Sequence, residues 1–224
     1  MTNIKPGSFR KISKLSGLVD LVLSLIKKIR IPKKIKLEIF DDPNIYDFTQ
    51  IYKTFKDEVY DPESVFYPSC GYDGTPSKVF GDKVTYLDIE KEVAHTHQEA
   101  GHKTLCQDIR SYIHQERYDL LIILNPQVPT PQMTKHLVSG GYVIANQYHG
   151  NASFLHASDD FTLLGVFVHG ALIRCNDLEP YTRTTSVKSL GRDRDLEKLM
   201  FETSETPKGL PFTKPADLYI FQKK

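Results

Sequence analysis

The chain has 224 residues, of which 40% are hydrophobic and 25% charged, and its formal net charge is +1. This length fits one domain of generous size or one domain with an appendage, and no apolar run reaches the roughly 18 residues that a membrane span needs. The three cysteines, Cys70, Cys106 and Cys175, are odd in number and far apart, which excludes a disulfide framework and a paired-cysteine motif. With no signal-peptide pattern at the N-terminus, the composition predicts a reducing, cytoplasmic setting.

The positive charge is concentrated at the N-terminus. Residues 1–36 hold ten Lys or Arg and one acid, Asp20. The remaining chain keeps 19 basic and 27 acidic residues, a net charge of −8. Such asymmetry predicts an arm that meets an anionic partner, either a membrane surface or a nucleic acid.

Residues 14–31 have the apolar spacing of an amphipathic helix. One interpretation is an arm that binds a membrane surface or nucleic acid. The other is a helix that packs its apolar face on the domain, which we favour because Leu21 and Leu23 widen that face. We therefore predict a basic helical extension over residues 1–58 and a folded domain over residues 59–224.

From residue 60 onward, predicted strands alternate with helical stretches. The strands are predicted at 64–67, 83–89, 103–106, 118–124, 142–148, 161–168 and 218–222, and helices at 90–101 and 134–138. The run "YDLLIIL" is apolar throughout, which is typical of a strand buried on both faces of a parallel sheet. The alternation predicts an α/β fold with a doubly wound, mostly parallel sheet. Residues 170–215, which contain several prolines, are predicted to be an insertion.

Polar residues and glycines follow the predicted strands. In open α/β sheets, ligands bind beyond the carboxyl ends of the strands, where the strand order reverses. The residues at these ends are Ser69, Cys70, Gly71, Asp73 and Gly74 after the first strand, Asp88 after the second, Asp108 after the third, Asn125 and Pro126 after the fourth, and Tyr148 and His149 after the fifth. One such residue would mean little, but the series predicts a ligand site at this edge.

The chemistry of the series favours a nucleoside. The glycine turn leads into a helix whose N–H groups suit polar or anionic groups. Asp88 lies 17 residues beyond Gly71, so it is a candidate acceptor for both hydroxyls of a ribose. Asp108 could accept a hydrogen bond from an exocyclic amine such as adenine N6. The alternatives are that the acids cap helices and that the glycines form a tight connection.

The series resembles the class I S-adenosylmethionine-dependent methyltransferases over about residues 60–170. "SCGYDG" is similar to their glycine-rich first motif, "VTYLDIE" to their second, and "YDLLIILNPQ" to their fourth-strand motif. The resemblance implies a seven-stranded sheet with a last antiparallel strand, S-adenosylmethionine as cofactor, and Asp88 as the ribose-binding acid. It also implies that "LCQDI" places Asp108 beside adenine and that Asn125 and Pro126 serve catalysis. Tyr148 and His149 are predicted to contact the substrate because they lie near the predicted mouth of the site.

The sequence departs from that family in two places. The family's acid at the end of the first strand falls here on Tyr67 or Pro68, so Asp73 would have to supply the carboxylate from the turn. The fourth motif continues with Gln127 and Val128, without the aromatic residue that would stack on a target base. A nucleobase acceptor is therefore not implied.

Three functional hypotheses follow. The first is methyl transfer from S-adenosylmethionine to a small-molecule acceptor, which suits the acidic domain better than nucleic acid does. The second is a non-catalytic binding protein on the same fold, and the third, disfavoured by the lack of Gly-x-Gly-x-x-Gly, is a nicotinamide-dependent oxidoreductase. No metal is predicted, because His95 and His97 are two residues apart and cannot share a helix face. Cys70 is not predicted to be a nucleophile, because the sequence identifies no histidine partner for it.

Overall fold

The computed structural model describes residues 47–113, 117–124, 126, 128–147, 150–174, 177–183, 212 and 214–224. These residues belong to the second of two units into which the chain divides, Ile39–Lys224. The predicted amphipathic helix at 14–31 and most of the predicted insertion lie outside the described residues. Within the described part, no helix is long and apolar enough to cross a membrane.

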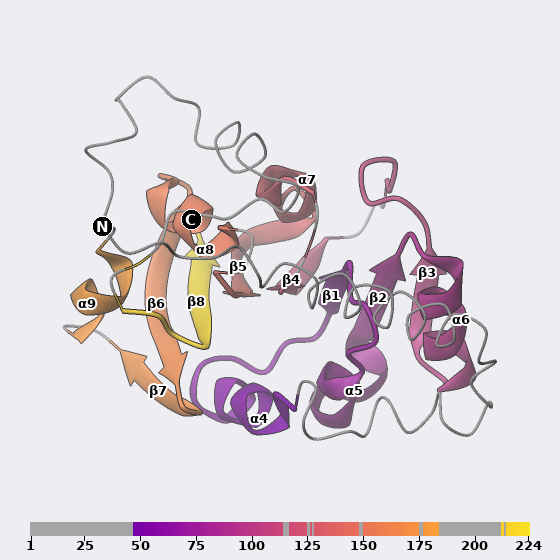
Figure 1. Cartoon of the computed structure of the whole chain (residues 1–224), viewed down its shortest axis with the longest axis horizontal. Coiled ribbons are helices and arrows are strands. Elements are labelled where there is room, and N and C mark those ends of the chain that lie inside the picture. The colour runs from indigo at the N-terminus through magenta and orange to yellow at the C-terminus, as the bar shows by residue number, and fades with distance from the viewer. Residues whose placement is uncertain are drawn as a thin grey trace, which may run out of the picture. The chain divides into compact units, whose positions relative to one another are not determined.

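Eight strands form one sheet (Figure 1). They are β1 (Val65–Pro68), β2 (Val84–Asp88), β3 (Lys103–Cys106), β4 (Tyr118–Ile123), β5 (Leu137–Ala145), β6 (Phe161–Val168), β7 (Ala171–Arg174) and β8 (Leu218–Lys223). Their order is β3-β2-β1-β4-β5-β8-β6-β7, with β1 to β5 parallel and β8 antiparallel to both β5 and β6. The order reverses between β1 and β4, which places the expected ligand site at the carboxyl ends of these strands.

Helices cover both faces of the sheet (Figure 1). They are α4 (Thr49–Glu58), α5 (Thr75–Phe80), α6 (Lys91–Glu99), α7 (Thr130–Thr134), α8 (Asn151–Ala157) and the short α9 (Glu179–Thr182), with a 3-10 turn, η2, at Gly81–Lys83. Apolar side chains of α4, α5 and α6 pack on one face, and those of α7 and α8 on the other. Alternate residues of each central strand therefore enter different cores.

The aromatic side chain of Phe66 shows how closely one of these cores is packed. Phe66 is fully buried in β1 and stacks on Tyr118 and Tyr112, with ring centroids 4.6 and 5.3 Å apart. Its neighbours Val65 and Tyr67 point into the opposite core. Because β1 is buried on both faces, the loop that follows it is held in a fixed position at the sheet edge.

The sheet confirms the predicted α/β, mostly parallel architecture with its antiparallel strand at 218–222, and it adds an eighth strand. Ala171–Arg174, predicted to begin the insertion, pairs with β6. The two-residue turn between them has φ of 50° at His169 and 77° at Gly170, which is the conformation of a tight hairpin. Sequence reasoning missed this hairpin because the strand is short and half-exposed.

The helix predicted at 134–138 is wrong in position. The observed helix, α7, ends at Thr134, and Leu137 already pairs with Tyr118 in the sheet. Pro131 fixes the first turn of α7 four residues earlier than expected, because proline is preset for that position.

The folded unit begins before residue 59, the predicted start of the domain. Tyr52 and Phe55 of α4 are fully buried, and the ring of Tyr52 lies 5.9 Å from that of Phe80. The ring of Phe55 lies 5.8 Å from that of Tyr142 in β5. Helix α4 is thus part of the domain and covers the same face as α5.

Candidate functional site

The turn after β1 is the first part of the candidate site. It runs over residues 69–74, between β1 and α5, at the point where the strand order reverses. Ser69 and Gly71 have φ of 52° and 54°, in the left-handed region. Open space surrounds the position that a Cβ of Gly71 would take, so the backbone conformation, not crowding, requires glycine there. The amide of Ser69 donates to the carbonyl of Leu87 at 2.7 Å, which ties the turn to β2.

We expect Ser69→Gly to raise the free energy of unfolding by about 0.5 to 1 kcal/mol. The left-handed conformation is strained for a non-glycine residue, whereas glycine adopts it without strain. Part of this stabilisation is offset because glycine gives the unfolded chain more conformational entropy. Urea unfolding measures the change. Ser158→Gly is the control, because Ser158 has φ of −83° and should gain nothing. A destabilised Ser69→Gly protein would show that the hydroxyl outweighs the backbone strain.

Asp88 joins the turn to the start of α6. Its Oδ2 accepts the amide of Gly71 at 3.0 Å, and its Oδ1 accepts the amide of Glu90 at 2.9 Å. The carboxylate therefore fixes the turn and the loop that leads into α6, but it is not the N-cap of that helix, which is Glu90. Asp88 is 8% exposed, and an ionised carboxylate offers about four acceptor positions, so it keeps acceptor capacity beyond these two bonds.

Ile89 adds an apolar surface beside Asp88. Its side chain is 61% exposed, although it directly follows a buried strand. An exposed aliphatic side chain next to a carboxylate suits a ligand that has both a flat ring and hydroxyl groups. Sequence reasoning missed Ile89, because only the solvent exposure distinguishes it from the core residues of the strand.

Asp73 faces the interior of the turn. It is 8% exposed, its Oδ1 accepts both the amide and the hydroxyl of Thr75, at 2.9 and 2.6 Å, and its Oδ2 accepts the hydroxyl of Tyr67 at 3.2 Å. Burial raises the pKa of Asp73, and the hydrogen bonds from Thr75 and Tyr67 oppose that shift. These three hydrogen bonds give Asp73 a structural role in the turn, and the ligand contact predicted from the sequence stays a prediction.

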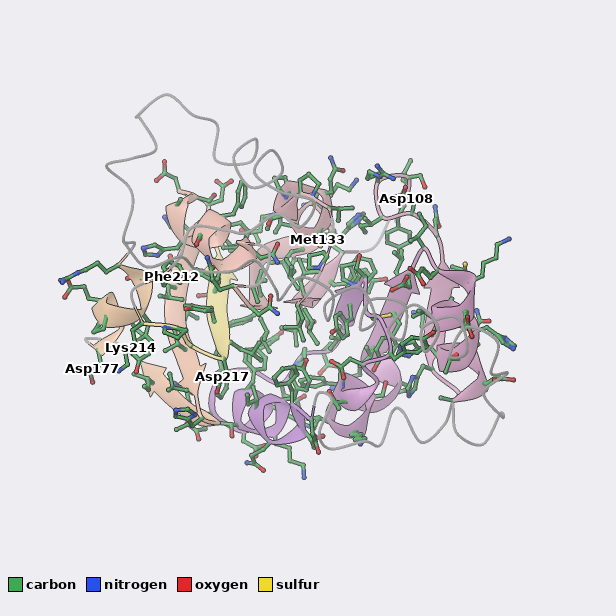
Figure 2. The ribbon with its side chains drawn as sticks, in the orientation of Figure 1. Asp108, Met133, Asp177, Phe212, Lys214 and Asp217 are labelled. Carbon is green, nitrogen blue, oxygen red and sulfur yellow. The ribbon has the colours of Figure 1, made fainter. Side chains whose placement is uncertain are left out.

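Asp108 lies on the loop that follows β3 (Figure 2). Both of its oxygens accept Nε of Arg110 at 3.0 Å, and Oδ2 also accepts Nη2 at 2.6 Å. These hydrogen bonds lower the pKa of Asp108. The amide of the preceding residue, Gln107, donates to the carbonyl of Asp88 at 3.0 Å, so the structure brings the two predicted acids to neighbouring loops. The partner Arg110 was not anticipated.

The other predicted site residues lie in the turn and after β4, or outside the described residues. Cys70 is buried in the turn, and Gly74 precedes α5 and accepts a hydrogen bond from the hydroxyl of Tyr86 at 3.3 Å. Pro126 is buried just after β4. Asn125, Tyr148 and His149 lie outside the described residues, so their predicted catalytic and substrate-binding roles stay predictions.

A buried amide connects two of the segments that follow the central strands. Asn151 begins α8 and is 1% exposed, and its Oδ1 accepts the hydroxyl of Thr130 at 3.1 Å. This bond joins the segment after β4 to the segment after β5. No role for Asn151 was predicted from the sequence.

A histidine pair supports the glycine turn from behind. His97 of α6 is fully buried, and its Nε2 lies 2.8 Å from the carbonyl oxygen of Gly71 and 3.6 Å from Sγ of Cys70. Its Nδ1 lies 2.9 Å from Nδ1 of His102, and both rings stack on Tyr86. Burial raises the pKa of Cys70, so this cysteine–histidine contact does not create a thiolate nucleophile.

Protonation of this pair should cost stability in acid. Burial lowers the pKa of His97 to about 4, below its value of 6.5 in an unfolded chain. The unfolded chain therefore binds more protons between these two values, and stability is lost as the pH falls through that window. Glutamine does not titrate, so the free energy of unfolding of His97→Gln should fall less in acid than that of the wild type. We expect a difference of up to about 3 kcal/mol between the two proteins. Urea unfolding of both proteins from pH 7 to pH 4.5 measures it, and parallel curves would contradict it.

No family model matches the sequence, and no curated protein matches it. Among solved structures, the chain is similar to the N-methyltransferase NodS from Bradyrhizobium japonicum WM9 in complex with S-adenosyl-L-homocysteine, at 12% identity over 55% of this chain and 74% of that chain, with a TM-score of 0.42. It is similar to DesVI from Streptomyces venezuelae, at 14% identity over 63% and 67% of the two chains, with a TM-score of 0.42. It is also similar to coclaurine N-methyltransferase bound to N-methylheliamine and S-adenosyl-L-homocysteine, at 15% identity over 72% and 66%, with a TM-score of 0.43.

The fold class rests on the topology of the chain itself. The five parallel strands in the order 3-2-1-4-5, followed by an antiparallel strand inserted between β5 and β6, form a doubly wound, Rossmann-like sheet. The structure thus has the fold that the sequence motifs predicted, with one additional edge strand, β7.

Proposed function

We propose that this protein binds S-adenosylmethionine at the turn of residues 69–74 and transfers its methyl group to a small-molecule acceptor. The observation that carries the proposal is the hydrogen bond of 3.0 Å between Asp88 and the amide of Gly71 at the point where the strand order reverses. It places an acid at the end of β2 directly beside a left-handed glycine turn, the pairing that holds a ribose next to a backbone cradle.

The described residues fit an adenosyl group in three ways. The carboxylate of Asp88 can accept ribose hydroxyl groups, and Ile89 offers an apolar surface to the base. Asp108 and Arg110 lie on the neighbouring loop, where polar groups of the base would be recognised. The named neighbours NodS and coclaurine N-methyltransferase hold S-adenosyl-L-homocysteine, which agrees in kind with this assignment.

The bound cofactor would supply a methyl group on a sulfonium sulfur. A lone pair of the acceptor would form the new bond to that carbon, and the sulfur would keep the electron pair of the broken carbon–sulfur bond as a thioether. The proton of the acceptor would pass to a base or to solvent. The chain contributes mainly proximity and orientation. We propose that Asn125 orients the acceptor and that Tyr148 and His149 contact it.

The net negative charge of the chain outside residues 1–36 favours a small-molecule acceptor over nucleic acid. Outside residues 1–36 the chain carries a net charge of −8, which disfavours a polyanion on the domain surface. We therefore propose a small-molecule acceptor for the domain and, for the basic arm at 1–36, an anionic partner such as a membrane surface or a nucleic acid.

One observation favours the alternative of a non-catalytic binding protein. The position of the family's acid falls on Tyr67 or Pro68 at the end of β1, and the hydroxyl group of Tyr67 donates to Asp73. Asp73 is itself buried and accepts three hydrogen bonds. Neither residue offers an accessible carboxylate to the ammonium group of a bound methionine moiety, which would weaken cofactor binding.

Calorimetric titration separates these functions. The purified protein is titrated with S-adenosylmethionine, with S-adenosylhomocysteine and, as a control, with NAD. Micromolar binding of the first two compounds is expected and would justify a screen of methyl acceptors. If neither binds, the non-catalytic alternative replaces the proposal, and binding of NAD alone would favour an oxidoreductase.

A further inference from the structure

Both backbone polar groups of Gly71 are held by side chains from other elements. Its amide donates to Asp88 at the end of β2, at 3.0 Å, and its carbonyl accepts from Nε2 of His97 in α6, at 2.8 Å. Asp88 is the residue to which we assign the ribose. His97 is 26 positions from Gly71 in the sequence and fully buried, so it acts on the turn from the protein interior.

The hydrogen bonds determine where the protons lie. A carbonyl oxygen can only accept, so the contact with Gly71 requires a proton on Nε2 of His97. In a neutral imidazole the other nitrogen, Nδ1, is then an acceptor. The 2.9 Å contact between the two Nδ1 atoms therefore requires the proton on Nδ1 of His102. The pair is held in opposite tautomers, and His102 sets the tautomer with which His97 bonds the turn.

The surroundings of the pair keep it neutral near pH 7. Burial lowers the pKa of His97 to about 4 and lowers that of His102. Among the described residues, the titratable groups that face the pair are Cys70 from the turn and Tyr86 from β2, and burial raises the pKa of both. These two groups stay protonated and uncharged over the same range. His95, on the same helix, points away and pairs with Glu99 at 3.4 Å.

We propose that His97 is a positioning residue for the ligand turn, with its tautomer fixed by His102. By holding the carbonyl of Gly71, His97 keeps the amide of the same residue on Asp88, and so keeps the carboxylate oriented toward a ribose. This inference rests on the proposed adenosyl site. It predicts that ligand affinity depends on the N–H donor at the position of Nε2 and not on the presence of an imidazole ring.

The test compares two substitutions of His97. Glutamine places an amide N–H near the position of Nε2 and a carbonyl oxygen where His102 can donate, whereas leucine keeps the volume and removes the donor. Each variant is titrated with S-adenosylhomocysteine at pH 7.5, and His95→Leu is the matched control on the exposed face of α6. We expect binding by His97→Gln within about threefold of the wild type, at least tenfold weaker binding by His97→Leu, and no change in the control.

Nuclear magnetic resonance provides a second measurement on the free protein. The imidazole ¹⁵N shifts should show a proton on Nε2 of His97 and on Nδ1 of His102, and the amide of Gly71 should exchange faster in His97→Leu than in His97→Gln. Opposite tautomers to these, unchanged binding by a folded His97→Leu, or equal losses in both variants would overturn the proposal. If the wild type binds no adenosyl compound, the proposed function fails and so does the ligand part of this inference. In that case the measured tautomers and the exchange rate of the Gly71 amide still test whether His97 positions the turn.

Discussion

Asp88→Ala is expected to weaken the binding of S-adenosylhomocysteine at least 100-fold. The substitution removes the proposed acceptors for two ribose hydroxyl groups, and hydrogen bonds to a charged group are worth about 1.5 to 3 kcal/mol each. It also removes the partner of the Gly71 amide, which lies 3.0 Å from Oδ2, so Gly71 loses one of the two side chains that hold its backbone. Calorimetric titration at constant pH measures the change in affinity.

The fold of the Asp88→Ala protein must be checked at the same time. Asp82, an exposed aspartate in η2, supplies the matched control, and Asp82→Ala should bind as the wild type does. Circular dichroism and a thermal transition show whether each variant is folded. Wild-type affinity in a folded Asp88→Ala protein would remove the assignment of the ribose to this residue.

Asp73→Ala is expected to lower the free energy of unfolding by about 3 kcal/mol. The carboxylate accepts three hydrogen bonds inside a buried turn, from the amide and hydroxyl of Thr75 and from the hydroxyl of Tyr67. Truncation leaves these donors without partners, and each buried unsatisfied group costs about 1 to 3 kcal/mol. Part of this cost is offset because the burial of a charged group is no longer required. Urea unfolding measures the loss.

A double-mutant cycle identifies the source of that loss. Tyr67→Phe removes one donor and keeps the aromatic ring in the core. If the bond to Asp73 is made as observed, the double variant should lose less stability than the sum of the two single variants. The opposite pattern, a stable Asp73→Ala protein with weakened ligand binding, would return Asp73 to the ligand-binding role that the sequence suggested.

The sequence predicted the parts of the fold that depend on local patterns. The apolar run at β4 and the alternation of β1, β2 and β5 with helical stretches were sufficient for a parallel sheet. Helix α6 was expected to end at Gly101, and Gly101 indeed follows it with φ of 83°. The short strand β7 escaped prediction because its register comes from its partner, β6, and not from its own composition.

The sequence could predict only those site residues whose position follows from the end of the strand that precedes them. Asp88 and Asp108 are of this kind, and the structure sets them on neighbouring loops. The burial of Asp73 could not be foreseen, because it depends on Tyr67 and Thr75 enclosing the carboxylate. His97 was considered only with His95 as a metal ligand, whereas its contact with Gly71 depends on how α6 packs against the turn.

The position of β8 has a consequence for how the protein is made. Leu218–Lys223 lies between β5 and β6, which precede it in the chain by some 50 to 80 residues. The ribosome therefore synthesises β5 and β6 before β8, the strand that lies between them. Until β8 is made, the edges of β5 and β6 that it pairs with have no hydrogen-bonding partner. Unpaired strand edges can pair with those of another nascent chain. Slow translation or a destabilising substitution in β8 should therefore cause aggregation and not only local unfolding of the native protein.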